Sequence, residues 1–395
     1  MTRLDAPWLR DPAARAVLDA LEAEGGPDSA RFVGGCVRNT LMGQRVEDVD
    51  IATRLTPDRT IAALERARLK AVPTGVEHGT VTAVADHRPF EITTLRRDVE
   101  TDGRRAVVAF TEDWAEDAAR RDFRLNALYA DREGQVYDPT GGGLDDAHAG
   151  RIVFVGEAET RIREDYLRIL RFFRFFAWYG RGHPEAEGLA ACARLKDGVT
   201  SLSAERVSKE LLKLLAARDP RRSLSLMADA GVLPLVLPEA ANWDRFRAIV
   251  VLTSDPELRL AALLPDDPAL AQQMSARLRL SNAQRDRLVE ALRPARSFRR
   301  EEGRATLYRL GPAVFRDRVY LQWAERPEME PEARELLDLS ASWNPPRFPL
   351  TGEDVMAAGV TKGPEVGRTL RALEDEWIAS GFGEDREALL RRLAR

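Results

Sequence analysis

The stretch that decides the fold of this chain is Arg31-Phe-Val-Gly-Gly-Cys-Val-Arg38. Its first three residues predict a short strand, and Gly34 and Gly35 allow the backbone to turn tightly and to approach a ligand closely. The residues that follow have helical character as far as Gly43, so unpaired N–H groups at the start of that helix would face the turn. Arg38 adds a guanidinium fork that matches phosphate oxygens. This pattern is typical of a site that holds the phosphates of a nucleotide.

Two aspartates follow shortly afterwards, in Glu47-Asp-Val-Asp50. The surrounding valines and Ile51 predict a strand, and alternate side chains of a strand point to the same face. Asp48 and Asp50 would then project together, and two like charges so close need a cation between them. Carboxylate oxygens beside phosphate favour Mg²⁺, so the pair predicts a divalent metal site. The alternative is an ordinary strand with two surface aspartates.

Length and composition limit the class of protein. The chain has 395 residues, of which 31% are charged and 44% hydrophobic, which predicts two or more globular domains. Two cysteines and four histidines, with no HExxH sequence, argue against a disulfide framework and against histidine-based metal chemistry. No apolar run is long enough to span a membrane, and the first residues lack a signal-peptide pattern, so we expect a cytoplasmic protein.

The kind of secondary structure that the sequence predicts changes near residue 155. Before it, β-type runs alternate with short helices. These runs include residues 81–84, 90–95, 135–137 and 152–155. After it, apolar residues recur with the helical period. The sequence therefore predicts a small α+β head followed by a long all-helical body.

A second polar motif is Arg120-Arg-Asp-Phe-Arg-Leu-Asn126. Arg121, Asp122 and Asn126 could bring a cation and an amide to a triphosphate and a ribose. The alternative is an ordinary helix with polar pairs at i,i+4 spacing.

A third motif places Asp165, Arg168, Arg171 and Arg174 every three residues along a predicted helix. Asp165 and Arg168 could together read the edge of a base, since a carboxylate accepts from an exocyclic amine and a guanidinium donates to a ring nitrogen. Cytosine and adenine match this pair, whereas uracil and guanine present the reverse polarity. The alternative is a buried amphipathic helix with an ion pair.

The net charge of −4 argues weakly against a nucleic-acid partner, but the local charge of residues 276–310 is positive, with ten arginines and four acids. The arginines are Arg277, Arg279, Arg285, Arg287, Arg293, Arg296, Arg299, Arg300, Arg304 and Arg309. Such a stripe could carry a phosphate backbone. A solvated arginine-rich surface explains it equally well.

Together these motifs resemble the class II tRNA nucleotidyltransferase and poly(A) polymerase family, within the polymerase-β-like nucleotidyltransferases. The resemblance is strong over residues 31–215, with a second patch at 348–367. It implies a head with a small mixed β-sheet and helices, followed by an all-α neck, body and tail that grip the acceptor arm of tRNA. We expect the catalytic head at 1–155, the nucleotide-selecting neck at 156–218 and the RNA-binding body and tail at 219–395. The chain departs from the family at Asn39, where members usually have aspartate.

The resemblance implies a role for each residue of the motifs. Gly34, Gly35 and Arg38 are expected to hold the triphosphate. Asp48 and Asp50 are expected to ligate Mg²⁺ and to act in catalysis with Arg121, which contacts the nucleotide. Asp122 and Asn126 would shape the ribose and base site, Asp165 and Arg168 would select the incoming base, and Arg171 and Arg174 would complete the nucleotide pocket. Sites of this class often add a third carboxylate, for which Glu91 is the candidate. The alternative for Glu91 is a glutamate on a strand surface.

Two activities compete within the family, CCA addition to tRNA and polyadenylation. Residues 75–81, Gly-Val-Glu-His-Gly-Thr-Val, look like the G-x-x-H-G-T-V stretch of CCA-adding members, and residues 102–105 resemble the flexible loop needed for the final A. We therefore expect template-independent, Mg²⁺-dependent addition of CCA to the 3′ end of tRNA from CTP and ATP, with release of pyrophosphate. The expected partners are tRNA, CTP and ATP, with no membrane and no stable protein partner.

Several alternatives stay open at this point. Within the family they are a poly(A) polymerase and an enzyme that adds only CC or only A. Outside it they are an RNA-binding module with a decayed catalytic site, and an enzyme that transfers nucleotides to protein or to a small molecule.

Overall fold

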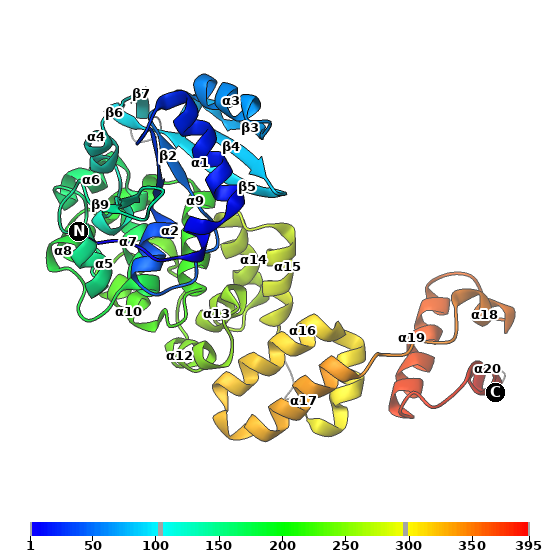
Figure 1. The fold of residues 1–395 in the computed structure, drawn as a ribbon. Helices are drawn as coiled ribbons and strands as arrows, with labels where there is room; N and C mark the ends of the chain where they lie inside the picture. Colours follow the sequence, from blue (N-terminus) through cyan, green and yellow to red (C-terminus); the bar gives the residue numbers. More distant parts are fainter. Residues whose placement is uncertain (1, 102–105, 295–298, 394–395) are drawn as a thin grey trace. The chain divides into compact units, whose positions relative to one another are not determined.

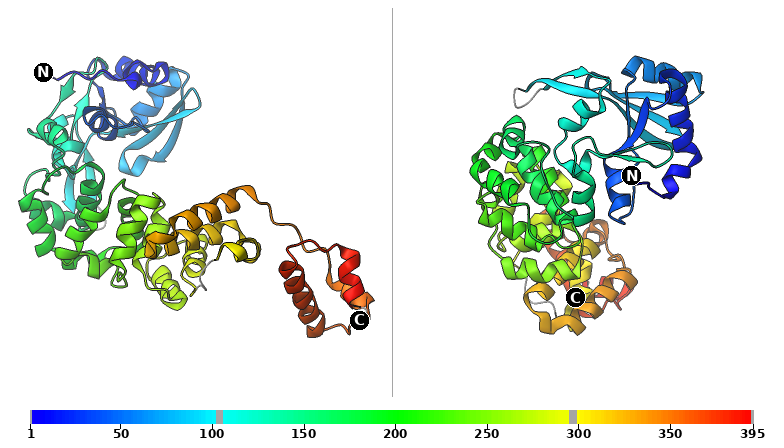
Figure 2. Two further views of the ribbon diagram at one scale, coloured as in Figure 1. Left: turned by 90° about the horizontal axis from the view of Figure 1, so that it is seen from below. Right: turned by 60° about the vertical axis from the view of Figure 1, so that its left-hand side comes forward.

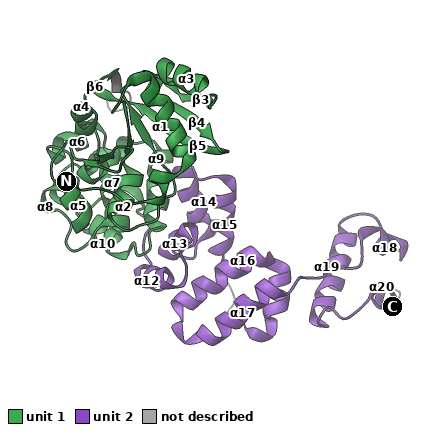
Figure 3. Cartoon of the chain, in the orientation of Figure 1, with its two compact units in different colours: residues 1–238 green, residues 239–395 purple. Residues whose placement is uncertain are grey.

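A computed structural model describes residues 2–101, 106–294 and 299–393 of the chain (Figure 1). The chain forms two compact units, Met1–Pro238 and Glu239–Arg395, and each is described by itself (Figure 3). The domain boundaries expected at residues 155 and 218 both lie inside the first unit, so that division stays a prediction.

A mixed β-sheet forms the centre of the first unit. Among the described residues it has seven strands in the order β3-β4-β5-β2-β1-β8-β9. The strands are β1 (Ala30–Val33), β2 (Ile51–Thr53), β3 (Lys70–Gly75), β4 (Thr80–Ala85), β5 (Arg88–Thr94), β8 (Tyr129–Ala130) and β9 (Val136–Tyr137), with β6 (Arg96–Thr101) and β7 (Ala106–Phe110) in a separate hairpin. β2 runs parallel to β5 and the other neighbouring pairs are antiparallel, which confirms the expected mixed sheet.

Short helices surround this sheet. They are α1 (Pro12–Gly25), α2 (Gly35–Leu41), α3 (Pro57–Arg66), α4 (Trp114–Ala119) and α5 (Gly143–Ala149), with 3₁₀ turns at Pro7–Arg10, Val76–His78 and Arg124–Asn126. α1 begins after Asp11, whose side chain accepts a hydrogen bond from the N–H of Ala13. It buries Val17, Leu18 and Leu21, and together with α3 it packs on the sheet (Figure 1).

The rest of the first unit is helical (Figure 2). Its helices are α6 (Ala158–Glu164), α7 (Leu167–Tyr179), α8 (Ala186–Arg194), α9 (Ala204–Leu215), α10 (Arg221–Asp229) and α11 (Leu233–Val236), with a 3₁₀ helix at Lys196–Ser201. Rings of Phe154 and Phe172 stack at 5.7 Å, and Phe123 lies 4.9 Å from Phe154. This cluster fixes the segment of the second motif against α7.

The prediction of a strand at residues 152–155 is wrong. Only a single bridge, between Phe123 and Phe154, forms there. The backbone of this segment pairs instead with the second motif, since the Arg124 N–H donates to Val153 and the Val155 N–H donates to Asp122.

The second unit is built of helices. They are α12 (Trp243–Leu252), α13 (Pro256–Leu263), α14 (Pro268–Arg277), α15 (Asn282–Ala291), α16 (Gly303–Glu325), α17 (Glu330–Ser342), α18 (Gly352–Ala357), α19 (Pro364–Ala379) and α20 (Arg386–Leu393), with 3₁₀ turns at Arg300–Glu302 and Pro327–Met329. α16 is kinked at Gly311, which has a φ of 74° and precedes Pro312. No helix within the described parts of the chain combines the length and the apolar character that crossing a bilayer requires.

Candidate active site

The predicted glycine turn joins β1 to α2. Gly34 has a φ of 68° and a ψ of −113°, a backbone conformation that favours glycine. Its N–H donates to the carbonyl oxygen of Leu128 at 3.1 Å. A Cβ atom added at Gly34 would lie 3.7 Å from both Nη1 of Arg121 and the carbonyl oxygen of Asn126. The turn therefore brings the second motif against the first.

The two aspartates do not lie inside a strand, which corrects the expectation from the sequence. β2 begins only at Ile51, and Asp48 and Asp50 precede it in an irregular segment. The carbonyl oxygen of Asp50 still accepts from the Val33 N–H at 3.0 Å. Because β1 ends there, at the turn of Gly34, it offers no further backbone partner to the residues before Asp50.

Asp50 lies in a crowded electrostatic environment. Its side chain is half-buried, whereas that of Asp48 is exposed. Burial, and then the carboxylates of Glu91 and Asp48, raise the pKa of Asp50 to about 6. Since β2 and β5 are parallel and Ile51 faces Ile92, Asp50, directly before β2, lies level with Glu91 in the middle of β5. This placement supports Glu91 as a third carboxylate, which stays a prediction.

This carboxylate pair fits a divalent cation. Among the described residues, the side chains of Asp48 and Asp50 have no hydrogen-bonding or ion-pair partner, and no three His, Cys, Asp or Glu side chains are grouped to hold a metal. A cation would relieve the repulsion that raises the pKa of Asp50. It would take few ligands from the protein and leave the remaining positions to water or phosphate oxygens.

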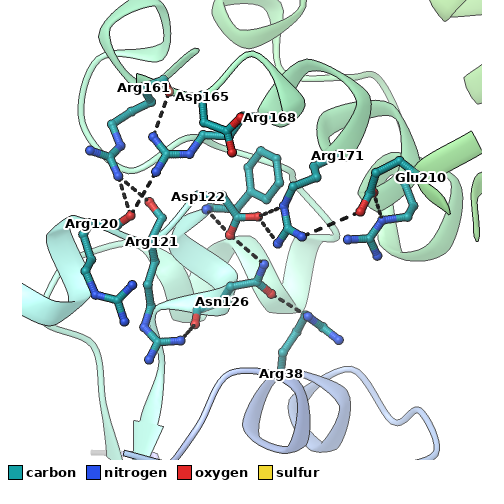
Figure 4. Close-up of polar contacts among 12 residues, drawn as sticks. Arg38, Arg120, Arg121, Asp122, Asn126, Arg161, Asp165, Arg168, Arg171 and Glu210 are labelled. Carbon is teal, nitrogen blue, oxygen red and sulfur yellow. Dashed lines mark hydrogen bonds and ion pairs between the residues drawn. The ribbon is translucent and has the colours of Figure 1, made fainter. Parts of the chain in front are cut away.

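Arg38 is buried against the second motif (Figure 4). Its Nη1 donates to Oδ1 of Asn126 at 2.5 Å, and Nδ2 of Asn126 donates to Oδ1 of Asp122 at 3.0 Å. Its Nη2 donates to the hydroxyl of Tyr179 at 2.7 Å and to Oδ1 of Asn39 at 2.8 Å. Burial lowers the pKa of Arg38. The departure at residue 39 therefore leaves a side chain that still orients Arg38.

The same network continues into α7 and α9 (Figure 4). Nε of Arg171 donates to Oδ2 of Asp122 at 2.7 Å, and Nε of Arg174 donates to Oε2 of Glu210 at 2.5 Å. Burial opposes ionisation of Asp122, but the Arg171 guanidinium and the amide of Asn126 outweigh it and hold its pKa at about 2. The residues predicted from three separate motifs are thus joined by direct contacts.

Arg121 is held by Asp117, a residue that we did not single out from the sequence. Nη2 of Arg121 donates to Oδ2 of Asp117 at 3.0 Å, and the Tyr129 hydroxyl donates to the same oxygen at 2.7 Å. Burial opposes ionisation of Asp117, but Arg121 and Arg120 hold its pKa at about 2. The available signal was the i,i+4 spacing of Asp117 and Arg121.

Asp165 is not on the same helix as the arginines, which corrects a second expectation. It stands two residues before α7, where its Oδ1 accepts from the N–H of Leu167 at 3.1 Å. Its Oδ2 accepts from Nη2 of Arg206 at 2.7 Å. Asp165 precedes the N-cap residue Tyr166, and its carboxylate satisfies an N–H that the first helical turn leaves unpaired.

Arg168 does not pair with Asp165 (Figure 4). Its Nη1 donates to Oε2 of Glu164 at 2.5 Å and to the carbonyl oxygen of Arg161 at 2.7 Å. Its Nη2 donates to the carbonyl oxygen of Arg120 at 3.2 Å. The residues expected to read a base therefore each have another partner.

A cleft of about 450 Å³ is lined by Arg38 of the first motif and by the two aspartates, Asp48 and Asp50. Its lining consists of Gly35, Arg38, Asn39, Gln44, Arg45, Glu47, Asp48, Asp50, Arg174, Trp178, Tyr179 and Lys213. Sequence reasoning missed Gln44, Arg45, Trp178, Tyr179 and Lys213. The predicted residues outside this lining are Gly34, Glu91, Arg121, Asp122, Asn126, Asp165, Arg168 and Arg171.

The arginine stripe of the second unit is largely neutralised. Arg287 contacts three carboxylates, those of Asp255, Glu257 and Asp317. Ion pairs also form at Arg277, Arg285, Arg293, Arg300 and Arg309. These pairs favour the solvated-surface alternative for much of the stripe. Arg296 and the loop expected at residues 102–105 lie outside the described residues.

Comparison with known families and proteins gives a consistent result. The poly A polymerase head domain matches residues 30–153, and the probable RNA and SrmB-binding site of polymerase A matches residues 183–244. The CCA tRNA nucleotidyltransferase 1, mitochondrial, of Danio rerio is 33% identical over 386 residues, which cover 92% of this chain and 87% of that protein. The CCA-adding enzyme of Bacillus cytotoxicus is 28% identical over 397 residues, which cover 95% and 96%.

A solved structure agrees with these relatives. The crystal structure of Bacillus stearothermophilus CCA-adding enzyme in complex with CTP has a TM-score of 0.82 and 26% sequence identity to this chain, and the match covers 97% of each. The matched residues therefore include those of both units. With the sequence match to the Danio rerio protein, it shows that the chain belongs to the class II tRNA nucleotidyltransferase and poly(A) polymerase family.

Proposed function

We propose that this chain adds C, C and A to the 3′ end of tRNA, using CTP and ATP without a nucleic-acid template and releasing pyrophosphate. The observation that carries the proposal is the cleft that Asp48 and Asp50 share with Arg38 and Arg174. It combines carboxylates suited to a divalent cation with guanidinium groups suited to phosphate. Relatives that match more than nine-tenths of the chain bear the names of CCA-adding enzymes.

Asp48 and Asp50 are proposed as the ligands of Mg²⁺, because this ion accepts few protein oxygens and binds together with phosphate groups. When bound, Mg²⁺ lowers the pKa of the attacking 3′-hydroxyl and neutralises charge on the phosphates. Arg38 stabilises negative charge on the phosphate oxygens as that hydroxyl attacks the α-phosphate. The new ester bond to the 3′ oxygen forms as the bond between the α- and β-phosphates breaks; pyrophosphate leaves, and the hydroxyl proton passes to water.

The choice of C or A is assigned to Asp165 and Arg168. Their hydrogen-bonding groups have the polarity that cytosine and adenine require. Arg168 must first exchange its bond to Glu164, and Asp165 its bond to Arg206, for bonds to the base. Arg121, Asp122 and Asn126 are proposed to contact the nucleotide as the family resemblance implies.

Two further features bear on the finer assignment. The G-x-x-H-G-T-V stretch forms the connection between β3 and β4, with a 3₁₀ turn at Val76–His78, and it supports CCA addition over polyadenylation. We also propose that the protein acts in the cytoplasm, although some relatives carry mitochondrial names.

The decisive experiment is to sequence the products formed from tRNA that lacks its terminal C, C and A, with all four nucleotides and Mg²⁺ present. We expect three added nucleotides in the order C, C, A, followed by a stop, and no addition in EDTA. Long A tracts on unrelated RNA would identify a poly(A) polymerase. Addition that ends after CC, or that adds only A to a CC end, would identify a partial enzyme.

A further inference from the structure

The cleft contains one lysine, Lys213, that lies near the end of α9 and is exposed. Among the residues that the structure describes, its ammonium forms no ion pair. Glu210, one turn earlier on the same helix, is bonded instead to Arg174 at 2.5 Å. Lys213 therefore brings to the cleft a positive charge without a bonded carboxylate.

Hydrogen bonds link the backbone of Lys213 to two other residues that line the cleft, Trp178 and Gln44. Nε1 of Trp178, on α7, donates to the carbonyl oxygen of Lys213 at 2.7 Å. The carbonyl oxygen of Trp178 accepts from Nε2 of Gln44 at 3.4 Å. Gln44 begins the irregular segment that carries Asp48 and Asp50. Two hydrogen bonds therefore connect the backbone of Lys213, through Trp178, to Gln44, which lies four residues before Asp48.

The surroundings of Lys213 favour an anion. Partial desolvation of its ammonium, and then the positive charges of Arg174, Lys209 and Arg171, lower the pKa of Lys213, and Glu210 acts in the opposite direction. A cation surrounded by other cations is stabilised when an anion binds between them. An ammonium has donors and no acceptor, so it binds phosphate as a point charge without distinguishing one base from another.

Resting on the proposed function, we propose that Lys213 binds the terminal phosphates of CTP and ATP, and then the pyrophosphate that leaves. Arg38 and Gly35 line the same cleft, which is where the triphosphate is expected. The base-reading residues Asp165 and Arg168 are outside its lining, so the cleft suits the part that CTP and ATP share.

Lys213→Met tests this role, and Lys209→Met is its matched control. Lys209 is an exposed lysine one turn earlier on α9 and outside the cleft lining. The measurement is the competition of CTP, CMP and pyrophosphate against labelled CTP bound to the full chain. In the wild type, CTP should compete much better than CMP. In Lys213→Met we expect the CTP advantage and the pyrophosphate affinity to fall by about tenfold or more, as for loss of one charge-assisted contact.

Two further measurements separate this role from others. Lys213→Arg keeps the charge and should keep most of the preference for CTP over CMP. The KM of CTP and that of ATP should rise together in Lys213→Met, while the KM of tRNA stays unchanged. Lys209→Met removes a more distant charge outside the cleft lining, so it should lower the CTP advantage far less than Lys213→Met does.

Three results would overturn the inference. They are an unchanged CTP-to-CMP ratio in Lys213→Met, an equal loss in Lys213→Arg or Lys209→Met, and a rise in the KM of tRNA alone, which would place an RNA phosphate at Lys213. The competition measures binding and needs no transfer. A failure of the proposed function would appear separately, as wild-type protein that binds CTP but does not extend tRNA with CCA.

Discussion

Asp50→Asn should abolish nucleotide addition and, at the same time, stabilise the metal-free protein at alkaline pH. The carboxylate of Asp50 is half-buried beside Glu91 and Asp48, and its pKa is raised from the ordinary 3.8 to about 6. The folded protein therefore holds the Asp50 proton more tightly than the unfolded chain does. Ionisation destabilises the fold progressively as the pH rises from about 4 to 6, and the full cost persists above that range. Asparagine keeps the shape and removes the charge.

The size of the effect follows from the pKa difference. A rise of about two pKa units, at about 1.4 kcal/mol for each, corresponds to about 3 kcal/mol at pH 8. At pH 5 only part of the difference is expressed, and the gain should fall to about half. Glu91→Gln should recover a smaller share, because it removes one of the two negative charges that raise the pKa of Asp50.

The assay is urea denaturation in EDTA, followed by tryptophan fluorescence at pH 8 and pH 5. The transition that shifts should be that of the first unit, residues 1–238, because Asp50 lies there. The reasoning would be refuted if Asp50→Asn were no more stable than the wild type at pH 8, or if its gain were equally large at pH 5. Nucleotide addition by Asp50→Asn with Mg²⁺ would separately refute the proposed metal role.

Three other substitutions test the contacts around the site. Asp117→Asn removes the negative charge that Arg120 and Arg121 share, and it should lower the free energy of unfolding by about 3 kcal/mol, measured by urea denaturation. Tyr129→Phe removes a neutral hydroxyl that donates to Asp117 and accepts from Nε of Arg121, and it should cost about 1 kcal/mol; an equal loss in both variants would contradict a charge-based role. Arg168→Ala should reduce discrimination between CTP and UTP in single-nucleotide incorporation. An unchanged preference would remove Arg168 from base selection.

The parts of the site that could be predicted from the sequence are those written in short motifs. Gly34, Arg38 and the two aspartates lie within twenty residues of one another, and their residue types already specify a turn, a phosphate contact and a metal pair. The structure differs in the backbone around the aspartates. Whether residues 46–50 form a strand depends on how far β1 extends beside them, and that is decided by the turn at Gly34.

The partner of Arg168 could not be predicted because two carboxylates compete for it within one helical turn. Glu164 and Asp165 precede it by four and three residues, and either spacing permits an ion pair on a continuous helix. The start of α7 determines which of the two carboxylates pairs with Arg168. The Asp165 carboxylate accepts hydrogen bonds from the N–H of Leu167 and from Arg206. Glu164 is therefore the carboxylate that pairs with Arg168.

Contacts between distant residues were also hidden from the sequence. Trp178 reaches the backbone of Lys213 across 35 positions, and Arg38 reaches the Tyr179 hydroxyl across 141. Nothing in the spacing of these residues indicates which helices pack together. Asp117 was missed for a related reason: α4 also carries Glu116, and the i,i+4 spacing to Arg121 does not by itself show which acidic side chain is buried.

Within this network, the positive charge without a bonded carboxylate is that of Arg38, which lines the cleft. Asp122 neutralises Arg171, and Glu210 neutralises Arg174. The side chains that hydrogen-bond to Arg38, by contrast, are all neutral. They are Asn39, Asn126 and Tyr179. A carboxylate at residue 39, as the family usually has, would place a negative charge directly on this guanidinium. In this chain, Asn39 orients Arg38 through the same side-chain oxygen while leaving its charge available to a phosphate.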